Sequence, residues 1–127
     1  MNDEQVWDFE RELWVGGREA YDRQVDPHVL MALPAKPYLY DEAAAVAAVK
    51  DTPVWERAEF AEKRLERHGE DLIAIGYRVE AARGEQDYHA LCSSVIRRNR
   101  GGDWRVIQHQ QTPFGMEVAD PRERADG

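Results

Sequence analysis

His109 is the side chain in this sequence best suited to transfer a proton, because imidazole titrates near neutral pH. Side chains alternate between the two faces of a strand, and the expected strands place His109 on the same face as Tyr77 and Ser94. The Tyr77 hydroxyl could polarise a substrate carbonyl while His109 acts as acid or base. A histidine satisfied by sheet neighbours in the core would show the same pattern, so both roles stay open.

The expected ligand-lining set is wider than the tentative catalytic pair His109 and Tyr77. It mixes apolar and polar side chains, as ligand cavities usually do. Its members are Trp14, Met31, Trp55, Tyr77, Cys92, Ser94, His109 and Gln111. The two tryptophans could equally belong to the core. Cys92 is the only cysteine, so no internal disulfide forms, and we expect it to behave as a small buried hydrophobe.

Other chemistries lack the residue patterns that they need. The four histidines show no metal-ligand spacing such as His-Glu-x-x-His, so we expect neither a metal site nor a cofactor. Ser93-Ser94 lacks the Gly-x-Ser-x-Gly elbow of serine hydrolases, and no glycine pair resembles a phosphate-binding loop. Glu10, Glu19 and Asp22 are carboxylates on expected helices, but we expect most such acids on solvated faces.

Length and composition predict one soluble globular domain, since 127 residues suffice for a single core. The formal net charge of −8 opposes binding to nucleic acid, and we interpret the arginines near residue 100 as a solvated hairpin end. No signal peptide and no apolar run of membrane-spanning length is evident. We therefore expect a cytoplasmic protein with no nucleic-acid or membrane partner.

Three helices and one strand are expected in the N-terminal half. Apolar residues at helical spacing, a stop at Gly16-Gly17 and an N-cap at Asp41 indicate the helix limits. The expected helices cover Val6–Leu13, a short stretch through Ala20 to Val25, and Glu42–Lys50, and the expected buried strand covers Val29–Leu33.

The rest of the chain predicts a meander of antiparallel strands over Val54–Arg67, Asp71–Ala82, Tyr88–Arg98 and Trp104–Thr112. A helix over the first of these ranges is an alternative. If Gly101-Gly102 forms a two-residue hairpin loop, Ser94 faces His109, Cys92 faces Gln111 and Ile96 faces Ile107. Ile107, His109 and Gln111 would then share the inner face. Residues 116–127 are expected to form a frayed tail.

This order of elements resembles the nuclear transport factor 2-like cone fold, in particular its SnoaL-like and uncharacterised bacterial branches. The residues that carry the resemblance are Leu13-Trp14, Met31 to Pro34, Trp55, Ser93-Ser94 and Trp104 to Pro113. The resemblance implies an α+β domain over residues 1–115, a cone-shaped roll in which about three N-terminal helices cover the concave face of a strongly curved antiparallel sheet. It also implies a pocket inside the cone and a homodimer through the outer sheet face.

Three functions remain open under this resemblance. The first is binding of a small apolar or mixed-polarity ligand, the second is a lyase, isomerase or cyclase that uses His109, and the third is a non-catalytic dimeric association module. Ketosteroid isomerases of this superfamily use a carboxylate base. The expected strand bodies 72–79, 88–98 and 104–112 contain no carboxylate, which argues against that reaction here.

Overall fold

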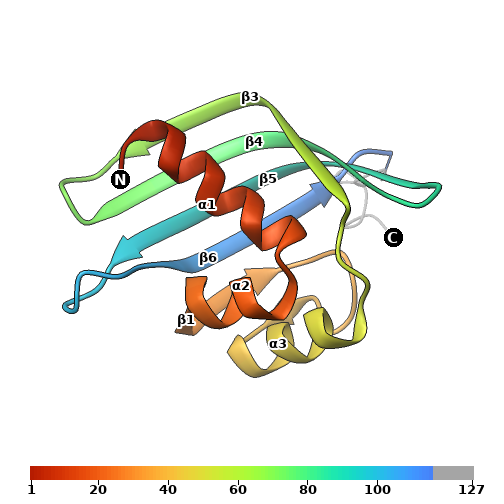
Figure 1. The fold of residues 1–127 in the computed structure, drawn as a ribbon, viewed down its shortest axis with the longest axis horizontal. Helices are drawn as coiled ribbons and strands as arrows, with labels where there is room; N and C mark the ends of the chain where they lie inside the picture. The colour runs from red at the N-terminus through yellow and green to blue at the C-terminus, as the bar shows by residue number, and fades with distance from the viewer. Residues whose placement is uncertain (116–127) are drawn as a thin grey trace, which may run out of the picture.

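The structure, a computed structural model, describes residues 1–115, which form three helices and one six-stranded sheet (Figure 1). The expected frayed tail, residues 116–127, lies outside the described residues. The helices are α1 (Asp3–Val15), α2 (Gly17–Gln24) and α3 (Glu42–Asp51). The strands are β1 (Val25–Ala32), β2 (Leu39–Tyr40), β3 (Arg57–Arg67), β4 (Leu72–Arg83), β5 (Gln86–Arg98) and β6 (Trp104–Pro113).

The sheet has the order β2-β1-β6-β5-β4-β3, and its strands β3 to β6 form the predicted antiparallel meander. One pair departs from the expected antiparallel sheet, because β1 runs parallel to β6. Parallel neighbours need a long connection, and α3 and four strands lie between these two along the chain. Register shifts within β3 and between β5 and β6 add local bends, which help to curve the sheet.

Two glycines turn the chain sharply from α1 into α2. Asn2 caps α1 through a capping box with Gln5, and Gly16 ends the helix. A Cβ at Gly16 would lie 2.6 Å from the backbone oxygen of Glu12, and Gly17 has a φ of +65°, so larger side chains would be strained at both positions. The helices can therefore cover one face of the sheet, with α1 crossing it diagonally (Figure 1).

Strand β1 begins earlier than the sequence indicated. The prediction started it at Val29 and extended the preceding helix to Val25, whereas the strand starts at Val25 and contains Asp26 and Pro27. The register with β6 is irregular between Val25 and Leu30, so Pro27 lies where no backbone donor is required for regular pairing.

The pairing of β5 with β6 confirms two of the three predicted contacts. Ser94 pairs with His109 and Cys92 with Gln111, but Ile96 pairs with Val106 and not with Ile107. The loop is longer than two residues, since the Asn99 amide donates to the Asp103 carbonyl at 2.8 Å. A bulge at Ile107 restores the register. The side chain at the core is accordingly Val106, which is fully buried.

This corrected register predicts unequal effects of truncation at two adjacent positions. Val106→Ala should lower the free energy of unfolding by about 2 kcal/mol, because buried methyl groups are lost and a cavity is left. Ile107→Ala removes more atoms but should cost only about 1 kcal/mol, because its side chain is half-buried. Urea unfolding of both variants measures the difference. A larger loss for the Ile107 variant would contradict the observed register.

Candidate functional site

Glu10 on α1 is the centre of a buried polar cluster between the helix and the sheet. Its Oε2 accepts hydrogen bonds from the Tyr77 hydroxyl at 2.5 Å and from the Ser94 hydroxyl at 2.6 Å. Glu10 and Ser94 are both 0% exposed. We expected most helix carboxylates to lie on solvated faces, but Glu10 is buried. Its spacing from Val6 and Leu13 places it on the buried stripe of α1. Helical periodicity in the sequence therefore contained the signal that Glu10 is buried.

His109 is joined to this carboxylate through Ser94. The Ser94 Oγ lies 2.7 Å from His109 Nδ1, and Glu10 Oε2 lies 3.5 Å from the same nitrogen. Because Ser94 donates its only proton to Glu10, the pair with His109 requires that Nδ1 carries a proton and donates it to Oγ. The neutral ring then has an acceptor at Nε2, and the Gln111 amide nitrogen lies 3.1 Å from it. The cluster therefore fixes one tautomer of His109.

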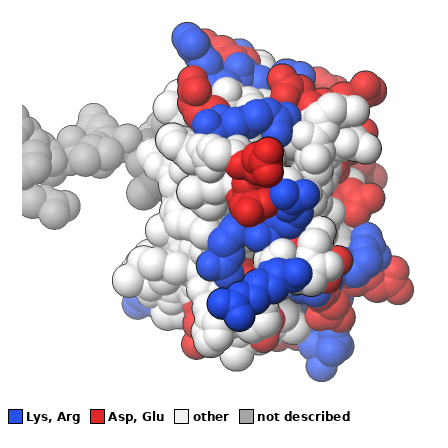
Figure 2. Space-filling model, turned by 90° about the vertical axis from the view of Figure 1, so that its left-hand side faces the viewer, with Lys and Arg blue, Asp and Glu red and all other residues white. Residues whose placement is uncertain are grey.

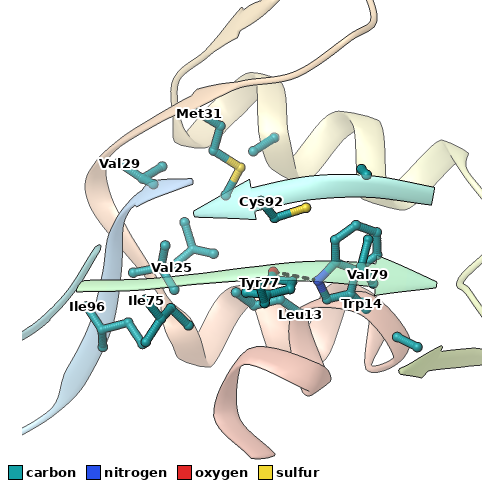
Figure 3. Packing of buried hydrophobic residues seen from close by; sticks show 14 of the residues in the cluster. Leu13, Trp14, Val25, Val29, Met31, Ile75, Tyr77, Val79, Cys92 and Ile96 are labelled. Carbon is teal, nitrogen blue, oxygen red and sulfur yellow. Dashed lines mark hydrogen bonds between the residues drawn. The ribbon is translucent and has the colours of Figure 1, made fainter. Parts of the chain in front are cut away.

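Tyr77 closes the other side of the cluster. Its hydroxyl accepts a hydrogen bond from the Trp14 indole at 3.0 Å (Figure 3) and donates to Glu10. Burial, and then the charge of Glu10, hold the pKa of Tyr77 well above its usual value. Burial and the same charge raise the pKa of Cys92 to about 12, so its thiol stays protonated near neutral pH. Tyr77 and Cys92 therefore act as neutral groups.

A cavity of about 170 Å³ lies beside the cluster, between the helices and the sheet. Of the eight expected ligand-lining residues, the cavity brings together five, namely Trp14, Met31, Trp55, His109 and Gln111. Tyr77, Cys92 and Ser94 are not among its lining residues and are buried in the core. Its apolar wall also includes side chains of α3 and the segment 52–55. His109, through Ser94, and Trp14, through Tyr77, thus connect the Glu10 cluster to the cavity.

The other lining residues were not predicted from the sequence, and two of them, Tyr21 and Arg83, bear on the electrostatics of the cavity. Tyr21 was assigned only to a short helix, and it faces the cavity from α2. Burial, followed by the charge of Glu10, raises the pKa of Tyr21 to about 12. The electrostatic effect of Glu10 consequently extends to the cavity wall.

No family model matches this chain, and no curated protein matches it. A candidate ketosteroid isomerase from Parabacteroides distasonis is similar in structure, with a TM-score of 0.76 and 16% identity over 88% of this chain and 87% of that one. A nuclear transport factor 2-like protein from Cytophaga hutchinsonii has a TM-score of 0.75 and 16% identity over 90% of this chain and 100% of its own. The association domain of C. elegans CaMKII has a TM-score of 0.70 and 13% identity over 86% of this chain and 90% of its own.

The chain has the nuclear transport factor 2-like fold. Identities this low establish the fold alone, because the same fold supports unrelated functions. The Cytophaga protein is matched over its whole length by 90% of this chain.

The surface of the chain carries interleaved charges at the end of the sheet where the β3–β4 and β5–β6 turns lie (Figure 2). Arg97 pairs with Asp26 at 3.3 Å and Arg98 pairs with Asp71 at 2.6 Å.

Residues 1–115 contain no group of three potential metal-ligating side chains. Within the same range no helix has the length and apolar character to cross a membrane.

The raised pKa of Tyr21 predicts a loss of stability at alkaline pH. The folded protein holds this pKa at about 12, against about 10 in the unfolded chain. The stabilisation is complete below the pKa of the unfolded chain and is lost as the pH rises toward the pKa of the folded protein. Between these two pH values the unfolded chain releases a proton that the folded chain retains. Tyr21→Phe should make the alkaline fall in unfolding free energy shallower.

Urea unfolding at successive pH values between 9 and 12 measures that slope. Tyr38→Phe is the matched control, because Tyr38 is 53% exposed. It should leave the slope unchanged. Identical slopes for the Tyr21 variant and the parent protein would contradict the assignment.

Proposed function

We propose that the protein binds a small, mainly apolar molecule in the cavity between its helices and its sheet. The observation that carries this proposal is the composition of the wall, where apolar side chains surround the adjacent polar groups of His109 and Gln111. Such a mixture favours burial of an apolar body and orients it through one or two polar contacts. The volume of about 170 Å³ suits a compact ligand, since a cavity of about 150 Å³ holds benzene.

The hydrogen bond between Gln111 and His109 gives such a ligand a place to bind. The Gln111 carbonyl accepts from the Tyr88 hydroxyl at 2.9 Å, and its amide nitrogen lies 3.1 Å from His109 Nε2. A ligand hydroxyl could replace the amide as donor to Nε2, while a ligand carbonyl could accept from the released amide. When both exchanges occur together, His109 Nε2 and the Gln111 amide each keep a partner, so the desolvation cost of binding stays low.

Binding at this cavity predicts chemical-shift changes at particular indoles. Phenylacetamide, a single ring with one neutral polar group, should shift the Trp14 and Trp55 indole N–H signals in a ¹⁵N-correlated spectrum. Trp7 and Trp104 do not line the cavity and serve as internal controls. Ala48→Phe should abolish the shifts, because Ala48 lines the cavity and the added ring fills it.

The matched control for filling is Ala47→Phe, because Ala47 is exposed on the same helix. That variant should bind the probe as the parent protein does. Retained binding in the folded Ala48 variant would place the ligand elsewhere and would refute the proposal.

A second candidate function is proton transfer by His109, favoured by its link to Glu10. In this reaction Nε2 removes a proton from the carbon next to a substrate carbonyl, and the electron pair of the broken C–H bond moves toward the carbonyl oxygen to form an enolate. The resulting imidazolium keeps its Nδ1 proton, which is donated to the Ser94 hydroxyl oxygen. The Glu10 carboxylate, whose Oε2 lies 3.5 Å from Nδ1, balances the charge of the imidazolium. Returning the proton to a carbon of the enolate completes an isomerisation or an exchange.

This candidate predicts catalysed exchange of the α-protons of phenylacetone in D₂O, followed by ¹H NMR. His109→Gln should lower the rate at least about 100-fold, the usual contribution of a general base. His89→Gln should leave the rate unchanged, because His89 is exposed on β5. Equal rates with the His109 variant, checked for folding by its spectrum, would rule out His109 as the base.

A further inference from the structure

We infer that the cavity selects an anionic ligand: a single-ring carboxylic acid whose carboxylate binds Arg83. This inference rests on the proposed binding function and specifies its ligand class. Arg83 is the only Lys, Arg, Asp or Glu among the residues found to line the cavity within residues 1–115. An arginine beside an apolar cavity offers a planar donor group that matches a carboxylate.

The guanidinium of Arg83 is held in position by neutral partners. Its central carbon lies 4.1 Å from the centre of the Trp55 ring, which is a stacking arrangement. Its Nε donates to Gln86 at 2.8 Å, and its Nη1 donates to the Pro53 carbonyl at 2.6 Å. These contacts leave Nη2 without a hydrogen-bond partner among the described residues. A preorganised donor loses little side-chain entropy when an anion binds.

The positive charge of Arg83 is not balanced by a carboxylate of the described chain. No Asp or Glu within residues 1–115 forms an ion pair with it, although the chain contains 25 acidic residues. The carboxylate of Glu56 instead accepts a hydrogen bond from the Gly84 amide. A ligand carboxylate would supply the missing counter-charge.

The far end of the cavity disfavours an anion, which sets the direction of binding. A series of contacts separates Arg83 from His109: Trp55 stacks on Tyr88, and Tyr88 bonds to Gln111, which lies beside His109. Behind His109 lies the charge of Glu10, which adds to the effect of burial in raising the pKa of the cavity residue Tyr21. The carboxylate therefore belongs at Arg83, with the ring against the apolar wall.

Size and donor number restrict the anion further. A volume of about 170 Å³ accommodates one ring, since benzene fits a cavity of about 150 Å³. One guanidinium with a single uncommitted amino group suits a singly charged carboxylate better than a phosphate dianion, which usually needs several donors.

Three single-ring probes of similar size test the inference: phenylacetate, its neutral isostere phenylacetamide, and cationic phenethylamine. Dissociation constants come from the Trp14 and Trp55 indole shifts during titration. Phenylacetate should bind about tenfold more tightly than the amide, as a charge-assisted hydrogen bond at a partly exposed site implies. Phenethylamine should bind more weakly than the amide. The preference for phenylacetate should weaken with added salt.

Arg83→Gln should remove the preference for the acid over the amide while amide binding persists. Arg64→Gln is the matched control, because Arg64 is exposed and does not line the cavity, yet its replacement changes the net charge equally. It should keep the preference. Because the acid and amide are first compared on the parent protein, the test does not depend on a variant that folds.

The outcomes separate this inference from the proposed function. Equal affinity of the acid and the amide, with shifts at Trp14 and Trp55, would overturn the role of Arg83 and leave ligand binding intact. A preference that survives in Arg83→Gln would also overturn it. Absence of shifts at both indoles with all three probes would refute the binding function and this inference with it.

Discussion

The burial of Glu10 constrains the rest of this structure. A carboxylate removed from water is costly unless donors replace its hydration. Here two hydroxyl groups from β4 and β5 donate to Oε2, while Oε1 has no hydrogen-bond partner among the described residues. Both donors must come from the sheet, so the cluster joins α1 to the strands in one position. Trp14, one turn further along α1, reinforces that position by donating to Tyr77. The indole and His109 are thereby placed at the cavity by the same contacts that stabilise the core.

The elements were predictable where local residue chemistry determines them. The Asp41 cap defined the start of α3, and the glycine pair after residue 100 located the hairpin that brings Ser94 opposite His109. The bulge at Ile107 was not predictable, since a longer loop and an extra residue compensate each other. Glu10 was missed because its hydrogen-bond donors lie more than sixty residues away in the sequence. The homodimer and the cytoplasmic location stay predictions.

The division between cluster and cavity explains why two functions can be argued from one site. Ser94 and Tyr77 donate hydrogen bonds to Glu10 inside the core. His109 and Gln111 instead line the cavity, where a ligand could reach their polar atoms. Binding needs only the cavity wall and the polar pair. Proton transfer needs in addition that Glu10 stabilise a charged imidazole. The fold is compatible with both uses, as expected for an architecture that hosts many functions.

Residues 52–55, which form part of the cavity wall, belong to neither a helix nor a strand. The segment is tied to the sheet through the Pro53 carbonyl and Arg83, and has no bond to the Glu10 cluster among the hydrogen bonds of the described residues. Irregular connecting segments tolerate changes of length and sequence better than the elements they join. The shape of the cavity can therefore diverge between related proteins while the proton-bearing groups behind it keep their geometry. In evolutionary terms, this part of the cavity wall can change without altering the contacts that stabilise the core.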